Sequence, residues 1–142
     1  MNLESSYKKC REIALKHYEN FPVGSLMFPE KNRKYIYSIY AFARTADDIA
    51  DSDVLSVNAK LNALNDMWRK LEMIEKNEAA DDDIFFALSD TVKSLKIPVT
   101  EFKNLLTAFK QDSVKQKYDK FSELLDYSKY SANPVGHLIL YV

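Results

Sequence analysis

The stretch YAFARTADDIAD, residues 40–51, decides the fold and the chemistry that this chain can carry. It ends a run that begins at residue 30, contains neither Gly nor Pro, and repeats apolar residues at three-to-four spacing. That pattern predicts one long helix and not a strand. On a helix, residues three and four apart are neighbours and form a continuous stripe. The stripe that carries the charged groups consists of Tyr40, Arg44, Asp47 and Asp51.

Apolar residues at the same spacing predict helices in most of the remaining chain. These helices are expected at residues 3–19, 58–76, 84–95, about 100–112 and from about 120 onward. Side-chain oxygens accept hydrogen bonds from the free N–H groups of a first helical turn. We therefore expect the acidic run 81–83 to cap the fourth helix and Thr100 to cap the fifth. The chain as a whole is predicted to be all-α, with about six helices and no competing strand pattern.

The bulk composition supports one helical domain. Only 2 Gly and 4 Pro among 142 residues disfavour a turn-rich β fold, and 46% hydrophobic with 29% charged residues excludes a disordered chain. An aromatic share of 13% is enough to build a large core or to line an apolar cavity. The balance of 20 basic and 21 acidic residues leaves a net charge of −1, so we expect no nucleic-acid partner.

The two ends of the chain bear on location and completeness. The N-terminus lacks the apolar core of a signal peptide, and the single Cys10 excludes an internal disulfide framework and fits a reducing compartment. We expect a cytoplasmic protein that is either soluble or in peripheral contact with the inner face of the membrane. The apolar run HLILYV, residues 137–142, has no helix-ending signal. We therefore expect residues 1–142 to be a single, incomplete domain, the N-terminal fragment of a longer protein.

Three carboxylates within five residues, at Asp47, Asp48 and Asp51, repel one another when they are partly buried. Arg44 offsets only part of that charge. A hard divalent cation would offset the rest, and Mg²⁺ takes carboxylate, water and substrate phosphate oxygens. From the spacing alone, a solvated acidic face is the more common explanation. The apolar and aromatic residues on both sides favour a phosphate-bearing substrate held through Mg²⁺.

Residues 40–51 strongly resemble the first aspartate-rich motif of squalene and phytoene synthases. Three more segments are similar to the bacterial hopanoid-pathway branch of that family, the HpnC type, and they occur in the same order. They are YENFPVGS (18–25), AFKQD (108–112) and YSKYSANPVG (127–136). The similarity runs from about residue 7 to the end of the chain. It implies an isoprenoid synthase fold, with helices around a central cavity, and a chemistry that joins two prenyl diphosphates head to head.

The resemblance also implies roles for individual residues. Asp47 and Asp51 would be catalytic by holding Mg²⁺ on the diphosphate, with Asp48 as a further metal ligand. The residues expected to contact the diphosphate are Arg44, Tyr40, His17 and Asn20. Tyr127 would stabilise a carbocation by cation–π attraction, worth roughly 0.5–2 kcal/mol; a core tyrosine is the alternative. The residues expected to line the cavity for a prenyl chain are Phe21, Ser131, Ala132, Val135 and Gly136.

The reaction implied is Mg²⁺-dependent conversion of presqualene diphosphate to hydroxysqualene. The alternative is head-to-head prenyl transfer, for example from farnesyl diphosphate, that yields presqualene diphosphate, squalene or phytoene. The family also needs a second aspartate-rich motif, which is expected shortly after residues 133–136 and which no other carboxylate pair of this chain replaces. A catalytically inactive helical fragment or binding module is therefore the competing hypothesis.

Overall fold

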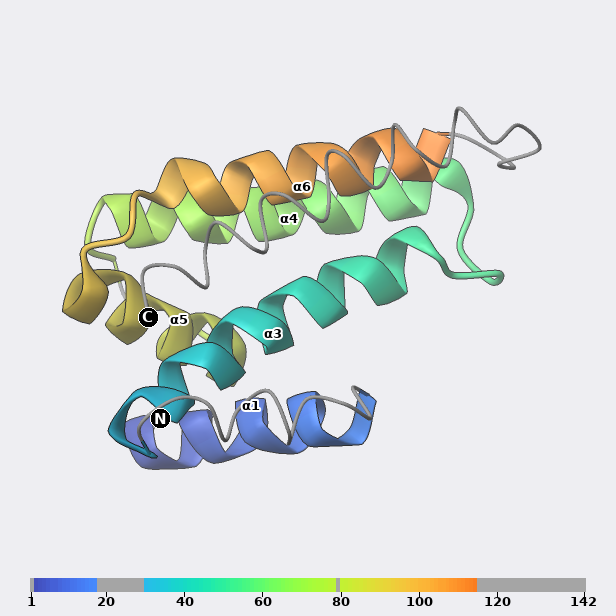
Figure 1. The fold of residues 1–142 in the computed structure, drawn as a ribbon. Coiled ribbons are helices and arrows are strands. Elements are labelled where there is room, and N and C mark those ends of the chain that lie inside the picture. The colour runs from blue at the N-terminus through green and yellow to red at the C-terminus, as the bar shows by residue number, and fades with distance from the viewer. Residues whose placement is uncertain (1, 18–29, 79, 115–142) are drawn as a thin grey trace.

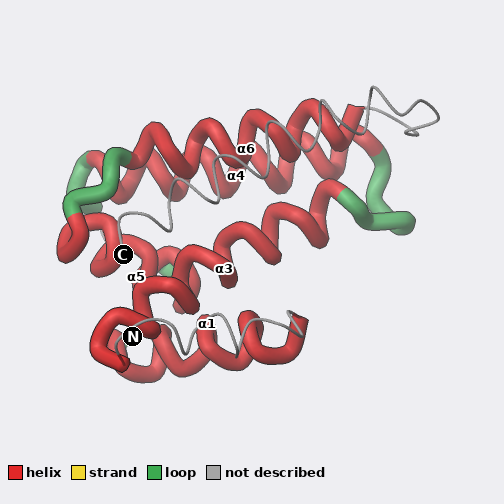
Figure 2. Tube along the Cα trace, viewed as in Figure 1, coloured by secondary structure: helices red, strands yellow, loops and turns green. Residues whose placement is uncertain are grey.

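The computed structural model describes residues 2–17, 30–78 and 80–114, which form five α-helices and contain no strand (Figures 1 and 2). The helices are α1 (Leu3–His17), α3 (Glu30–Ala50), α4 (Val57–Glu75), α5 (Asp83–Leu95) and α6 (Val99–Val114). The predicted all-α class is confirmed. The sixth helix, expected from about residue 120, lies outside the described residues. None of the described helices is both long enough and apolar enough to cross a membrane.

Side-chain caps fix where two of these helices begin. Asp82 caps α5 as expected, because its Oδ1 accepts a hydrogen bond from the Phe85 N–H at 2.9 Å. Ser56 caps α4 in the same way and accepts from the Ala59 N–H at 3.1 Å. Each cap satisfies a backbone donor that has no partner within the helix.

The cap predicted at Thr100 is wrong. Helix α6 begins one residue earlier, at Val99, and the carbonyl of Pro98 accepts the N–H of Glu101 at 3.1 Å. The fixed φ of proline, about −65°, already suits entry into a helix. The backbone therefore turns into α6 at Pro98, which leaves Thr100 inside the first turn.

Helix α3 is the element around which the other four are packed. It runs between α1 and the α4–α6 pair in Figure 1, and it contacts all four of the other helices. Its contact faces carry small side chains that are at most 5% exposed, namely Ala41, Ala43, Ala46 and Ala50. The distance between packed helices depends on the side chains at their contact, so alanines allow close approach. The position of α3 is therefore set from several sides at once.

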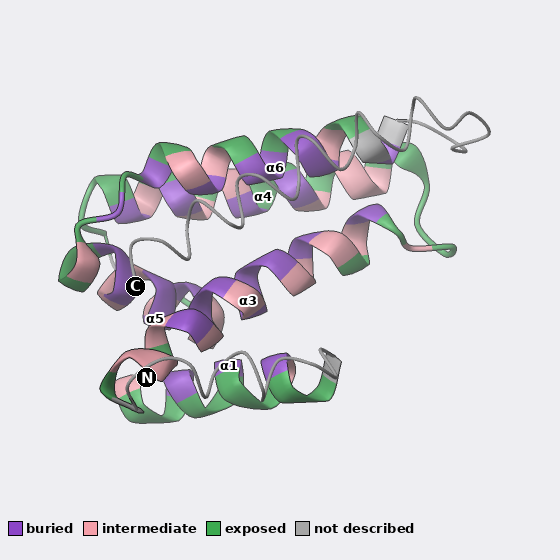
Figure 3. Ribbon diagram, in the orientation of Figure 1, coloured by how far each residue is buried: buried purple, intermediate pink, exposed green. Residues whose placement is uncertain are grey.

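The main core lies between α3, α4, α5 and α6, and Figure 3 shows buried positions on each of them. Phe42 of α3 is fully buried at its centre. Its ring meets Phe85 of α5 and Phe102 of α6 edge to face, with ring centroids 5.8 and 5.3 Å away. Burying one such side chain contributes roughly 1.5–3 kcal/mol. These contacts orient α3 about its own axis and so decide which side of the helix remains for other partners.

A group of polar side chains joins α1, α3 and α5, and we call it the polar clasp. It consists of the buried Tyr7, Ser38 and Thr91 and the half-buried Asp90. The hydroxyl oxygens of Ser38 and Thr91 lie 2.6 Å apart, and the Tyr7 hydroxyl lies 3.1 Å from that of Thr91. The Tyr7 hydroxyl donates to Asp90 Oδ2 at 2.7 Å. Burial raises the pKa of the Tyr7 phenol far above its usual range, so Tyr7 keeps the proton that it donates.

Removing the centre of the polar clasp should destabilise the fold. In Thr91→Val, the hydroxyls of Ser38 and Tyr7 lose a partner while remaining buried, and we expect a loss of about 1–2 kcal/mol in the free energy of unfolding. Thr107→Val is the matched control, because Thr107 is exposed and donates only within α6, to the Lys103 carbonyl at 3.0 Å. Urea denaturation followed by circular dichroism measures both. Equal losses in the two variants would contradict a stabilising role for the clasp.

Candidate functional site

The charged stripe occupies the C-terminal half of α3. Asp51 follows the helix directly, and its N–H donates to the Asp47 carbonyl at 2.9 Å, so the two carboxyl groups stand one turn apart. The side chains of Arg44 and Asp47 are each 29% exposed, whereas that of Asp48 is 53% exposed. Tyr40 is half-buried, and burial raises the pKa of its phenol. The inner part of the stripe is thus partly removed from water.

Arg44 is placed between two of the carboxylates. Its Nε lies 3.0 Å from Asp48 Oδ1, and its Nη1 lies 3.8 Å from Asp47 Oδ2. The Nε–H is not aligned with either oxygen, and this buried nitrogen has no hydrogen-bond partner among residues 2–17, 30–78 and 80–114. A buried donor without a partner costs about 1–3 kcal/mol. Arg44 therefore offsets the charge of both carboxylates, and one of its donors is not satisfied by the described residues.

The carboxyl groups of Asp47 and Asp51 disturb each other. The pKa of Asp47 is raised from 3.8 to about 6, mainly by burial and then by the charge of Asp51 and a hydrogen bond with it, while Arg44 acts in the opposite direction. The two carboxyl groups repel each other when both are charged. A proton shared between them, or a cation bound by both, would relieve the repulsion.

The carboxyl groups of the described residues suit a metal ion that takes only some of its ligands from the protein. No three His, Cys, Asp or Glu side chains among residues 2–17, 30–78 and 80–114 converge as a metal site. Asp47 and Asp51 form a pair, whereas the Asp48 carboxylate is turned toward Arg44. Mg²⁺ commonly takes one or two carboxylates and completes its shell with water and substrate phosphate oxygens. The pair suits that role, and the assignment of Asp48 as a ligand stays a prediction.

The other predicted site residues belong to other parts of the chain. His17 is the last residue of α1. The remaining predictions, which lie outside the described residues, concern Asn20, Phe21, Tyr127, Ser131, Ala132, Val135 and Gly136. The structure therefore brings together the α3 residues of the predicted site, and the roles of the others stay predictions.

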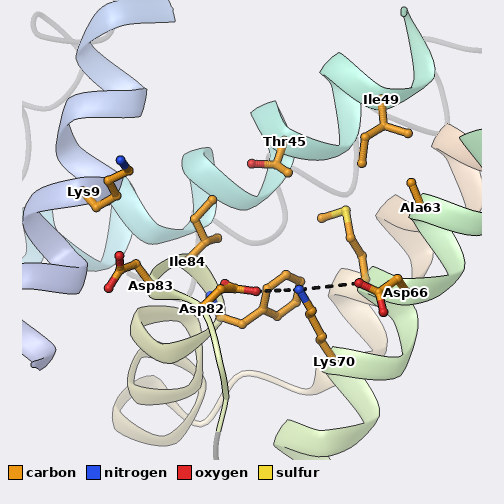
Figure 4. A pocket seen from close by; sticks show the side chains of 11 residues that line it. Lys9, Thr45, Ile49, Ala63, Asp66, Lys70, Asp82, Asp83 and Ile84 are labelled. Atoms are coloured by element: carbon orange, nitrogen blue, oxygen red, sulfur yellow. Dashed lines mark hydrogen bonds and ion pairs between the residues drawn. The ribbon is translucent and has the colours of Figure 1, made fainter. Parts of the chain in front are cut away.

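A separate pocket of about 390 Å³ opens between α1, α3, α4 and α5 (Figure 4). Helix α3 contributes Thr45 and Ile49, which are rotated by about 100° from Arg44 and Asp48 and thus face another side of the helix. At this pocket Lys70 lies 2.7 Å from Asp82 and 3.5 Å from Asp66. Its ammonium group is already paired, so these contacts tie α4 to the start of α5. The pocket contains none of the predicted site residues.

Sequence reasoning did not single out Lys60, which lies at the end of the stripe. Its Nζ donates to the carbonyl of Ala50 at 2.9 Å, next to Asp51. A signal for it existed in the sequence, since α3 has no basic residue in its last turn. That absence predicts that a cation from elsewhere should cap this helix end.

The raised pKa of Asp47 predicts how stability depends on pH. A carboxyl group that holds its proton more tightly in the folded state stabilises the protein at low pH, and this contribution is lost as the pH rises from about 4 through about 6. Asp47→Asn has no carboxyl group that must lose a proton at this position, so its stability does not fall in this way. At pH 8 the variant should be more stable than the wild type by about 1–2 kcal/mol. At pH 4 the two should be nearly equal.

Denaturation in urea at pH 4, 6 and 8 measures this difference. Asp53→Asn is the control, because Asp53 is an exposed aspartate in the neighbouring loop. We expect its effect to be the same at all three pH values. A difference between Asp47→Asn and the wild type that does not change with pH would contradict the assigned shift.

The sequence of this chain is similar to those of known proteins. The family model described as squalene/phytoene synthase matches residues 14–142. The chain is 36% identical over 130 residues to a hydroxysqualene synthase of Sinorhizobium fredii, and 30% identical over 137 residues to a 15-cis-phytoene synthase of Synechococcus elongatus. These matches cover 92% and 95% of the chain. The chain spans only 43% of the length of either relative.

A solved structure gives the same result for the fold. The crystal structure of squalene synthase HpnC from Alicyclobacillus acidocaldarius matches 98% of the chain with a TM-score of 0.84 and 36% sequence identity. The match covers 51% of that structure's chain. The resemblance stated from the motifs is therefore confirmed at the level of family and fold.

Proposed function

Because the chain belongs to the squalene/phytoene synthase family, we propose that it carries one half of the Mg²⁺ and diphosphate site of a synthase that acts on prenyl diphosphates. The single observation that supports this most is the buried Arg44 Nε without a hydrogen-bond partner, beside the Asp47–Asp51 pair. A buried donor beside two carboxyl groups that repel each other suits an anion that binds together with a cation.

Each residue of the stripe has a distinct task in this proposal. Arg44 binds diphosphate oxygens, for which its planar guanidinium is well shaped. Asp47 and Asp51 hold the cation against the same diphosphate. When bound, Mg²⁺ neutralises the charge that develops on the departing diphosphate. Tyr40, one turn before Arg44, adds a partly buried hydroxyl to the same side of the helix.

The reaction that the relatives favour is conversion of presqualene diphosphate to hydroxysqualene, a step of hopanoid biosynthesis. The S. fredii hydroxysqualene synthase supports this choice. In balanced form, the C–O bond to diphosphate breaks and the diphosphate leaves with the electron pair. The carbocation rearranges and takes the oxygen of one water molecule, which then loses a proton. An apolar cavity protects the cation until that water adds.

Head-to-head prenyl transfer is the second candidate, since the S. elongatus relative is a phytoene synthase. Its substrates carry the same diphosphate headgroup, so the α3 stripe serves both reactions equally. Product analysis separates them. Hydroxysqualene formed from presqualene diphosphate supports the first reaction. Presqualene diphosphate, squalene or phytoene formed from farnesyl or geranylgeranyl diphosphate supports the second.

Loss of either carboxylate of the pair should abolish most of the activity. In Asp47→Asn and Asp51→Asn we expect Mg²⁺-dependent diphosphate release to fall roughly 10²- to 10³-fold, because the cation loses a charged ligand. The assay uses the purified chain and the product of the full reading frame that encodes it, each with labelled presqualene or farnesyl diphosphate. Circular dichroism should show unchanged helix content in both variants.

Asp53→Asn is again the matched control, and its turnover should equal that of the wild type. Wild-type rates in Asp47→Asn and Asp51→Asn would refute the metal-ligand assignment. If the product of the full reading frame releases no diphosphate with any of the prenyl diphosphates, the proposed synthase function itself is refuted.

A further inference from the structure

The end of α3 carries its charges against the helix dipole. A helix C-terminus is equivalent to roughly half a negative charge, which disfavours carboxylates and favours cations within the last turn. Helix α3 nevertheless has Asp47 and Asp48 in its last turn, Asp51 directly after it, and no basic residue there. The last turn of this helix is thus weakened at the place where the proposed site needs a rigid spacing.

Lys60 of α4 supplies what this helix end lacks. Its Nζ donates to the Ala50 carbonyl at 2.9 Å in a partly buried contact. That carbonyl is among the last four of α3, which receive no hydrogen bond from an N–H group of the same helix. Ala50 itself is only 4% exposed, so leaving its carbonyl without a partner would be costly. The contact joins the end of α3 to the beginning of α4.

The position of Lys60 in its own helix strengthens the point. It lies in the first turn of α4, where its backbone N–H donates to the Ser56 carbonyl at 3.0 Å. A cation in a first turn is disfavoured by the dipole of that helix, and α4 has no acidic residue there to offset it. The gain from Lys60 therefore lies at α3.

We propose that Lys60 is a positioning residue for the cation-binding pair Asp47 and Asp51, an inference that rests on the function proposed above. It acts through the backbone of Ala50, which adjoins Asp51, and touches neither metal nor diphosphate. By tying down the last turn of α3, it holds the two carboxyl groups at the spacing that one cation needs. It also offsets part of the negative charge that the helix end and the carboxylates share.

Two variants and one control test this role. Lys60→Met keeps the side-chain length but removes charge and donor, and Lys60→Arg keeps both. Lys93→Met is the control, because Lys93 is an exposed lysine on α5 and its loss changes the net charge equally. One readout is amide hydrogen exchange at Asp51 and Ser52, whose N–H groups bond to carbonyls of the last turn. The other is calorimetry of inorganic pyrophosphate binding at increasing Mg²⁺ concentration.

We expect Lys60→Met to exchange these two amides roughly 3- to 10-fold faster and to need roughly 3- to 10-fold more Mg²⁺ for half-maximal pyrophosphate binding. Lys60→Arg should restore both quantities to within about twofold of the wild type, and Lys93→Met should change neither. A purely structural loss would lower thermal stability but would leave the Mg²⁺ requirement unchanged.

The outcomes separate this inference from the function on which it rests. If wild-type chain binds pyrophosphate with Mg²⁺ and Lys60→Met binds it equally well, the positioning role is overturned while the site stands. Unchanged amide exchange in Lys60→Met overturns the assignment of Lys60 as the residue that caps the end of α3. If the wild type takes up no pyrophosphate at any Mg²⁺ concentration, the proposed site fails, and the role of Lys60 fails with it.

Discussion

The carboxyl groups of Asp47 and Asp51 lie one turn apart at the C-terminal end of α3, where the helix dipole opposes negative charge and partial burial opposes it further at Asp47. Two cationic side chains offset part of this repulsion, each from a different helix. Arg44 does so from within the helix, one turn before Asp47, and Lys60 does so from α4 through the Ala50 carbonyl. Neither removes the repulsion, which is why a bound cation would gain free energy here.

Because the charged groups of the stripe repel one another, they stay together only on a helix that is held firmly in place. The opposite side of α3 is fixed by Phe42, whose ring is held between Phe85 and Phe102, and by alanines that let α1, α5 and α6 approach closely. The polar clasp adds directional contacts at Ser38, two residues before the first residue of the stripe. Packing on one side thus keeps the acidic groups together on the other.

Periodicity predicted most of this arrangement, because the facts it needs are local. The α3 run, its stripe and the Asp82 cap all depend on residues within one or two turns of each other. The prediction that Thr100 caps α6 is wrong because the backbone carbonyl of Pro98 accepts the hydrogen bond that begins the helix. Side-chain preferences for the cap position do not predict such a backbone contact.

The remaining contacts could not be predicted from spacing. Ser38 and Thr91 are 53 residues apart, and in the sequence each is one small hydroxyl residue among many. Only the packing of α1, α3 and α5 chooses which hydroxyls meet. The sequence of α3 predicts only that some cation should cap its end, and tertiary packing decides that this cation is Lys60, whose partner is a backbone carbonyl ten residues away. The family motifs predict which residues form the site, whereas the contacts that hold these residues in place depend on tertiary structure.

The proposed site on the stripe differs from the pocket beside α5 in how far its charged groups are already satisfied. Both contain several aspartates and a cation. In the pocket, Lys70 is paired with Asp82 and Asp66, so a ligand would have to break contacts that already satisfy these groups. In the stripe, Arg44 is ion-paired with Asp47 and Asp48, but its buried Nε makes no hydrogen bond within the part of the chain that the structure describes, and two carboxyl groups repel each other. A cation with its anion relieves both costs together, so binding there gains free energy that the pocket cannot offer.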